Sequence, residues 1–357
     1  MPKQQQANQR PRTRIDVHTH LIPPFWAEEL KTHGGDPSGW GSPEWSPEHL
    51  LRFMDEEEIA ISVLSLTAPS VEVWKGDDRT EMTHRVNDYG ANLMAQNMKR
   101  FGYFATLPLP DIDATLSEIK RAYDELHVDG VTLHSNYDDI YISDPRFEPI
   151  WEELERRSAT VFLHPTRPPM PVLPGAPSPV ADYPADTTRS ALDLVLKGHR
   201  KQFASTNVIL SHGGGYLPFA ATRFAELSAS LSKDRDAEDF MTDIRSFYYD
   251  TALVAPSGLP SLISTIPSEH IVFGTDYPYA SEKVCKIFTA NLDKSAAGEF
   301  DVLQAVNRNA AGLIPRFGSV LREDFSNSSS AYMKLARIAR TGRVPLDVMP
   351  APATGLK

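Results

Sequence analysis

The chain contains one cysteine, Cys285, so no disulfide can form within it and nothing points to an oxidising compartment. We expect this thiol to pack in the core. The sequence also lacks apolar runs of membrane-spanning length, and the polar stretch 1–13 has no apolar segment typical of a secretory signal. These absences favour a cytosolic protein.

Long basic runs are missing as well. The formal net charge is −11, which argues against nucleic acid or an anionic membrane surface as the main partner. A small anionic substrate remains compatible with this charge, because a few cations or a metal can reverse the field inside a pocket. The 357 residues suffice for one large α/β barrel or two ordinary domains.

Eight short apolar runs alternate with helical patterns along the chain. The expected strands lie at 14–22, 61–66, 101–107, 130–133, 160–163, 207–210, 247–253 and 270–273, and the expected helices include 80–99, 113–126, 147–157 and 190–203. This alternation predicts an α/β fold, the (β/α)8 TIM barrel. A doubly wound open sheet would usually place a glycine-rich turn after its first strand, where this chain has Leu21-Ile22-Pro23-Pro24.

Three regions follow from this pattern. We expect a disordered N-terminal arm over 1–13, the barrel over 14–318, and a C-terminal tail over 319–357 that packs on the barrel or on a neighbouring subunit. Two connections, 32–47 and 168–184, are rich in proline and glycine and cannot be regular helix. They follow strands one and five, so we expect them to be lid insertions over a site at the strand ends.

Side chains that bind metals or move protons gather where the expected strands end. They are His18 and His20 on strand one, His134 after strand four, His164 after strand five, His212 after strand six and Asp276 after strand eight. Each alone is more often an ordinary strand-end residue, but one coincidence repeated on five strands favours a functional site.

The stretch Ile15–His20, in the first expected strand, carries two of these candidate metal ligands. Residues i and i+2 of a strand share a face, so His18 and His20 point the same way and can hold one metal. With His164 and Asp276 they form an N₃O set suited to Zn²⁺, our first choice, or Mn²⁺. His212, before three glycines, suits acid–base work, and His134 lines the pocket or supports a ligand.

These motifs resemble the amidohydrolase superfamily, and more closely its metal-dependent decarboxylase branch, typified by aminocarboxymuconate semialdehyde decarboxylase. The resemblance rests on the HxH at His18–His20, the HP at His164, the SHGGG around His212 and the GTDYP around Asp276. HPTRPP (164–169) and FYYDTA (247–252) look most like fungal 6-methylsalicylate decarboxylases. The resemblance implies a homodimer acting in polyketide secondary metabolism, and conversion of 6-methylsalicylate to 3-methylphenol and CO₂.

Two departures from the superfamily narrow this expectation. Binuclear hydrolytic members bridge two metals with a carboxylated lysine on strand four, whereas Val131–His134 contains no lysine, so one metal ion is expected. Some dihydroxybenzoate decarboxylases replace the first histidine of the HxH with glutamate, but this chain keeps both. Loss of CO₂ would follow protonation of the ring carbon by Asp276 or His212, and our hypothesis makes Asp276 both ligand and proton carrier.

Substrate binding and two alternatives complete the interpretation. Arg167 and Arg189 are the arginines best placed to bind a substrate carboxylate, and Trp40, Trp45 or Trp74 could stack on an aromatic ring.

One alternative to the decarboxylase is a mononuclear metal-dependent hydrolase of a lactone or amide, with His212 activating water. A barrel that has lost activity and serves as a scaffold is the other. Asp16, on the same strand face as His18, either orients a ligand histidine or plugs the barrel floor.

Overall fold

The computed structural model describes residues 13–296 and 306–326. The chain divides into two units, Met1–Ile314 and Pro315–Lys357. In the first, eight parallel strands form one sheet in chain order. They are β1 (Arg14–His20), β2 (Ile59–Ser65), β3 (Phe101–Ala105), β4 (Gly130–His134), β7 (Thr160–His164), β8 (Asn207–Leu210), β9 (Tyr248–Asp250) and β10 (Ile271–Val272).

Backbone hydrogen bonds between the first strand and the segment after the last one close the sheet. The Val17 N–H donates to the Phe273 carbonyl at 3.0 Å, and the His20 N–H donates to the Tyr277 carbonyl at 2.8 Å. This closure confirms the predicted (β/α)8 barrel and excludes the open doubly wound sheet.

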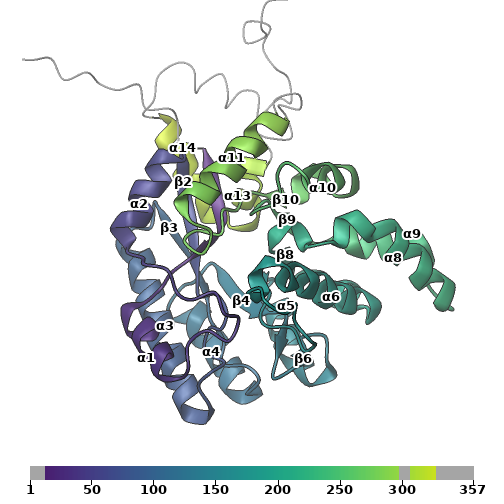
Figure 1. The fold of residues 1–357 in the computed structure, drawn as a ribbon, viewed down its shortest axis with the longest axis horizontal. Helices are drawn as coiled ribbons and strands as arrows, with labels where there is room; N and C mark the ends of the chain where they lie inside the picture. Colours follow the sequence, from purple (N-terminus) through teal and green to yellow (C-terminus); the bar gives the residue numbers. More distant parts are fainter. Residues whose placement is uncertain (1–12, 297–305, 327–357) are drawn as a thin grey trace, which may run out of the picture. The chain divides into compact units, whose positions relative to one another are not determined.

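Helices lie around these strands (Figure 1). They are α1 (Pro24–Thr32), α2 (Pro47–Glu56), α3 (Gly76–Gln96), α4 (Ile112–Asp124), α5 (Glu148–Arg156), α6 (Asp182–Leu196), α7 (His199–Gln202), α8 (Leu217–Leu231), α9 (Ala237–Arg245), α10 (Leu259–Thr265), α11 (Glu282–Ala296) and α13 (Ala310–Leu313). A two-stranded hairpin, β5 (Asn136–Tyr137) and β6 (Ile140–Tyr141), follows β4. The start of α2 is capped, because the Ser46 side chain accepts a hydrogen bond from the His49 N–H and Pro47 opens the helix.

The helix predicted over 190–203 was wrong at both ends. α6 begins eight residues earlier, at Asp182, because Pro184 is tolerated in a first helical turn. It ends at Leu196, and Gly198 adopts a left-handed conformation (φ 75°) before the short α7. The strands after which His134 and His164 were expected include these residues, so both histidines are terminal residues of strands.

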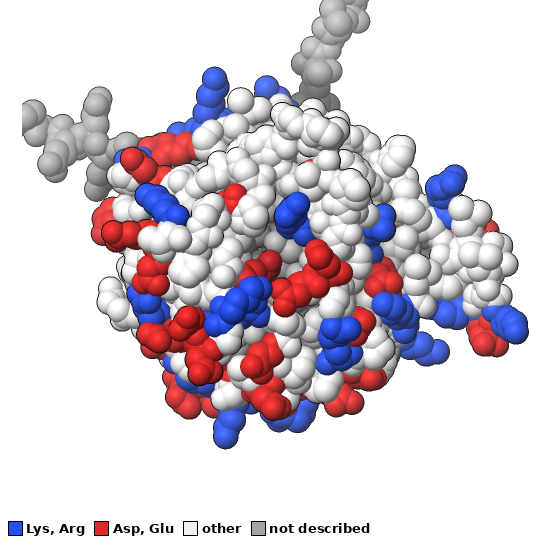
Figure 2. Space-filling view, turned by 60° about the horizontal axis from the view of Figure 1, so that its bottom comes forward, with Lys and Arg blue, Asp and Glu red and all other residues white. Residues whose placement is uncertain are grey.

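The second unit contributes α14 (Pro315–Ser326) to the description. The predicted tail lies outside the described residues from 327 onward, as does the predicted arm except Thr13. Within the described ranges, the structure contains no helix with the length and apolar character required to cross a bilayer. On the face drawn in Figure 2, basic and acidic side chains are interspersed.

Candidate active site

The first two candidate ligands share a face of β1, as the alternation predicted. The Nε2 atoms of His18 and His20 lie 3.1 Å apart, and both side chains are fully buried. Gly274 allows the neighbouring segment to approach, because a Cβ atom there would stand 2.8 Å from the His18 Cβ. The chain therefore packs tightly against β1 directly before Asp276.

Asp276 follows β10 in a left-handed backbone conformation (φ 66°), with its N–H donating to the His18 carbonyl at 2.8 Å. Its Oδ1 atom lies 3.2 Å from His18 Nε2 and 3.1 Å from His20 Nε2. Its Oδ2 atom lies 3.6 Å from His212 Nε2. One carboxylate therefore contacts the histidine pair on β1 and the expected acid–base group together.

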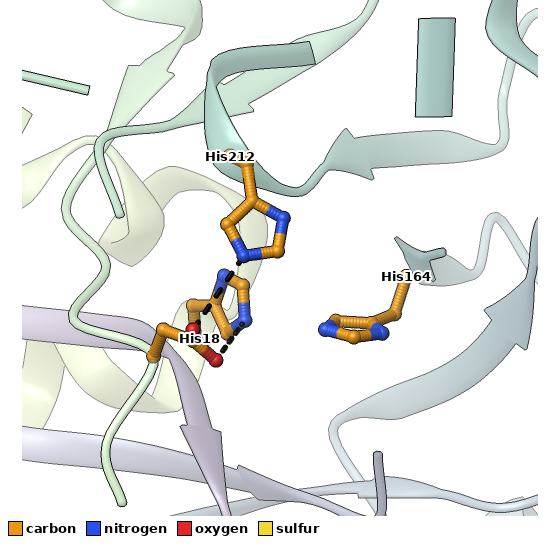
Figure 3. A group of neighbouring side chains, drawn as sticks. His18, His164 and His212 are labelled. Carbon is orange, nitrogen blue, oxygen red and sulfur yellow. Dashed lines mark ion pairs between the residues drawn. The ribbon is translucent and has the colours of Figure 1, made fainter. Parts of the chain in front are cut away.

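His164 and His212 approach this group from the ends of β7 and β8, and Figure 3 shows their rings directed with His18 toward one space. The ring centroid of His164 lies 5.1 Å from that of His20 and 5.6 Å from that of His212. One ligand atom from each of His18, His164, His212 and Asp276 can be chosen so that all four lie within 4.8 Å of one another. The structure thus brings all five predicted ligand and acid–base residues together.

The outward-facing ring nitrogens show that this group fits a metal ion. The Nδ1 atom of His18 contacts Asp250 Oδ2 at 2.6 Å, that of His20 contacts Ser65 Oγ at 3.2 Å, and that of His164 contacts the Pro165 carbonyl at 2.7 Å. If each Nδ1 carries the hydrogen, each Nε2 offers a lone pair to the shared space. Three such nitrogens and one carboxylate suit a divalent transition metal.

Burial and mutual contact separate the pKa values of these groups. Burial lowers the pKa of His20 to about 4 and, together with the charges of the neighbouring imidazoles, holds that of His164 well below its usual range. Burial alone would raise the pKa of Asp276, but hydrogen bonds from His18, His20 and His212 hold it well below its usual range. The carboxylate is thus ionised, whereas His20 and His164 are neutral at pH 7.

The depressed pKa of His20 predicts acid sensitivity of the metal-free protein. Below pH 6.5 the unfolded chain protonates this histidine while the folded chain resists until about pH 4, so stability falls as the pH drops through that window. The expected loss is about 3 kcal/mol for this group. Urea unfolding of chelator-treated protein at pH 7 and pH 4 measures it. His20→Gln should show a smaller loss, and an equal loss in both proteins would contradict the prediction.

His134, the remaining strand-end histidine, lies beside the group. Its Nδ1 atom contacts Glu72 Oε1 at 2.6 Å, and its ring centroid lies 6.3 Å from that of His164. It is buried, yet it is not among the residues that line the cavity described below. His134 and His164 are paired neighbours on β4 and β7, and both roles considered for His134, lining the pocket and supporting a ligand, stay predictions.

The two candidate substrate arginines lie away from the cavity. Arg167 and Arg189 are both exposed, and Arg189 donates to the Tyr141 hydroxyl at 3.2 Å. Neither belongs to the cavity lining, and none of the described lining residues is lysine or arginine. Arg167 follows His164 by only three residues in the sequence, but in the structure its side chain is exposed to solvent. A substrate-binding role for these arginines stays a prediction.

A cavity of about 630 Å³ opens above His164, His212 and Asp276. Its other walls are mostly apolar, with Leu253, Val254 and Leu262 among them. This volume and lining are typical of sites for small organic molecules.

Both Pro/Gly-rich connections contribute to the cavity wall. Trp40 belongs to the first and Val180 to the second, and the Ser178 N–H donates to the Ser38 carbonyl at 3.0 Å, joining the two segments. Of the three candidate stacking tryptophans, Trp40 alone lines the cavity, whereas Trp74 lies in the hydrophobic core and the half-buried Trp45 packs against it. That the two Pro/Gly-rich connections act as lids stays a prediction.

Sequence reasoning missed two carboxylates at the site. Asp250 ends β9, so the strand-end rule that found the histidines applied to it as well, although the expected strand ran on to residue 253. Asp36 lies in the first Pro/Gly-rich segment and lines the cavity, where burial raises its pKa. No motif in the sequence marks Asp36, because its position depends on how that segment folds over the barrel.

The structure also explains Asp16. Its carboxylate accepts hydrogen bonds from the Thr275 hydroxyl at 2.6 Å, the Thr275 N–H at 3.1 Å and the His18 N–H at 3.0 Å. These bonds tie β1 to the residue before Asp276. Of the two roles considered for Asp16, the structure therefore favours orienting the site.

A closed parallel barrel with histidines and an aspartate gathered at its strand ends is the arrangement of (β/α)8 enzymes, and such a group could hold a metal ion. The chain belongs to the amidohydrolase family, whose sequence model, described as "Amidohydrolase", matches residues 15–311. This confirms the resemblance noted in the sequence.

Two fungal proteins and one solved structure illustrate the relationship. The chain is 39% identical over 324 residues to "Decarboxylase yanB" of Aspergillus niger, covering 85% of this chain and 88% of that protein. It is 36% identical over 317 residues to "6-methylsalicylic acid decarboxylase acuB" of Aspergillus aculeatus, covering 85% and 96%. A dihydroxybenzoic acid decarboxylase from Polaromonas sp. JS666, solved with manganese and 2-nitroresorcinol, superposes with a TM-score of 0.69 at 23% identity, covering 85% and 97%.

Proposed function

We propose that this chain is a metal-dependent carboxy-lyase that removes CO₂ from an ortho-hydroxybenzoate without oxidation, with 6-methylsalicylate giving 3-methylphenol as the preferred reaction. The observation that carries the proposal is the double contact of Asp276, whose two oxygens reach the β1 histidine pair and His212 below an apolar cavity. The similarity to proteins named as decarboxylases supports it.

The residues proposed to hold the metal are His18, His20, His164 and Asp276, with Zn²⁺ as first choice and Mn²⁺ as the alternative. The N₃O donor set favours Zn²⁺, while the manganese in the Polaromonas enzyme supports the other ion. Bound there, the metal would orient the phenolic oxygen and carboxylate of the substrate and draw electron density from them. Absence of lysine from β4 supports a single ion.

The chain's own part in the chemistry is proton delivery. The ring carbon that bears the carboxylate takes a proton from the Asp276–His212 pair, which places an sp³ carbon in the ring. The bond to the carboxylate then breaks, CO₂ leaves, and the bonding electrons restore the aromatic ring, so the reaction consumes one proton and forms no aryl anion. Asp276 Oδ2 and His212 Nε2 lie 3.6 Å apart, so a small approach of the two groups on substrate binding would bring them to hydrogen-bond distance.

The cavity walls select for an aromatic substrate in this proposal. Leu253, Val254 and Leu262 offer apolar contact to the ring and its methyl group, and Trp40 of the first Pro/Gly-rich segment lines the same cavity. Because no lysine or arginine lines the described cavity, neutralisation of the substrate carboxylate falls to the metal and the imidazoles. We expect the enzyme to act as a homodimer.

The test is an assay of purified protein for bound metal, CO₂ release and product ultraviolet spectra, with 6-methylsalicylate, other hydroxybenzoates and a panel of lactones and amides. We expect bound metal, CO₂ release from 6-methylsalicylate, loss of that activity with a chelator, and its return with Zn²⁺ or Mn²⁺. Hydrolysis without CO₂ release would favour the mononuclear hydrolase and overturn the proposal. A protein that binds no metal would contradict both.

A further inference from the structure

Asp250 joins two parts of the site that come from different strands. Its Oδ2 atom contacts His18 Nδ1 at 2.6 Å, and its Oδ1 atom accepts from the Gly213 N–H at 3.3 Å and from the Ala252 N–H at 3.1 Å. Asp250 and His18 are both fully buried. The carboxylate thus reaches a proposed metal ligand with one oxygen and the residue after His212 with the other.

Each contact constrains a different group. As acceptor of the His18 Nδ1 hydrogen, Oδ2 fixes the ring so that Nε2 lies beside Asp276 and, in the metal-bound protein, would offer its lone pair to the ion. As acceptor of the Gly213 N–H, Oδ1 holds the turn that follows β8, where Gly213 has φ 61° and a Cβ atom would stand 2.7 Å from Val254 Cγ2. This turn sets where the His212 ring lies.

Tight packing keeps the Asp250 carboxylate from moving toward His18 and away from the Gly213 N–H, or in the opposite direction. A Cβ atom on Gly274 would stand 2.8 Å from the His18 Cβ and 3.2 Å from the Asp250 Cβ, so the backbone at this glycine presses on both side chains. A shift of Asp250 toward His18 would therefore lengthen its hydrogen bond to the Gly213 N–H and move the turn that carries His212.

We propose that Asp250 is a positioning residue that couples metal binding at His18 to the placement of His212. A carboxylate can accept from both sides, whereas asparagine at the same position offers one acceptor oxygen and turns an NH₂ group toward one of the two donors. Asp250→Asn, nearly equal in size, therefore breaks one link whichever way its amide lies. The activity part of this inference rests on the proposed function.

The experiment compares the wild-type protein, D250N and the control D186N. Asp186 is also fully buried, and its carboxylate accepts hydrogen bonds from Ser135, Asn136 and Tyr141 away from the metal group. Competition with a chromophoric chelator for Zn²⁺ and for Mn²⁺ should show affinity about 10- to 100-fold weaker in D250N. D186N should lower the urea midpoint and leave metal affinity unchanged.

Two further readouts test the coupling itself. At saturating metal, D250N should keep kcat about tenfold or more below wild type with KM little changed, because the acid–base ring is misplaced. In the wild-type protein, metal should slow hydrogen exchange of the 210–217 peptide, and D250N should weaken that response. This exchange measurement on wild-type protein also decides the matter if D250N fails to fold.

Three results would overturn the inference: wild-type metal affinity in D250N, full recovery of its kcat at saturating metal, or an unchanged exchange rate of the wild-type 210–217 peptide on metal addition. A wild-type protein that releases no CO₂ would instead refute the proposed function. The metal-affinity and exchange measurements would still decide the coupling in that case.

Discussion

Asp276→Asn is expected to abolish measurable decarboxylation, with a fall in kcat of about 10²–10⁴-fold or more. The asparagine keeps the size of the side chain but removes the charge that faces His18 and His20 at 3.2 and 3.1 Å, and it can carry no exchangeable acid proton toward His212. Metal affinity should fall together with activity. Metal content by mass spectrometry and kcat in excess metal separate the two losses.

The same control used for Asp250 serves this prediction. D186N removes a buried carboxylate from the barrel without touching the site and should retain activity and metal. An Asp276→Asn protein that holds its metal and turns over near the wild-type rate would refute the dual role of Asp276 as ligand and proton carrier.

His212→Asn is expected to lower kcat by about 10²–10⁴-fold while the protein keeps its metal, because an acid–base group is lost and the four proposed ligands remain. His20→Gln provides the matched comparison, since it should lose metal first. Metal content by mass spectrometry and kcat in excess metal are measured for both variants.

Geometry makes this comparison decisive. One ligand atom each from His18, His164, His212 and Asp276 lie within 4.8 Å of one another, so His212 is also near enough to be considered a ligand. If His212→Asn loses metal and His20→Gln keeps it, then His212 takes the place assigned to His20. The acid–base assignment would then pass to Asp276 alone.

The barrel and the metal group were predictable from local patterns. Alternation alone places His18 and His20 on one face, and the closure of parallel strands brings strand ends together, so His164, His212 and Asp276 needed no further information to meet. The resemblance to amidohydrolases added the number of metals and the expected reaction.

The start of α6 was missed because the Pro/Gly-rich connection 168–184 was taken to exclude helix, whereas Pro184 fits a first helical turn. Asp250 was overlooked because the expected strand was drawn three residues too long, which hid its terminal position. Such errors arise at the ends of helices and strands, where tertiary packing, and not residue type, decides where an element begins or stops.

The barrel closes at a seam, the hydrogen bonds between β1 and the segment after β10, and this closure determines when the site can form during synthesis. His18 stands near one end of the described chain and Asp276 near the other, and the two meet because the Asp276 N–H bonds to the His18 carbonyl. A ribosome must therefore release nearly all of the barrel before His18 and Asp276, the first and last of the proposed ligands, can meet. Metal loading at the proposed site would follow that late step, and a chain that stops short of the seam leaves β1 with an unpaired edge.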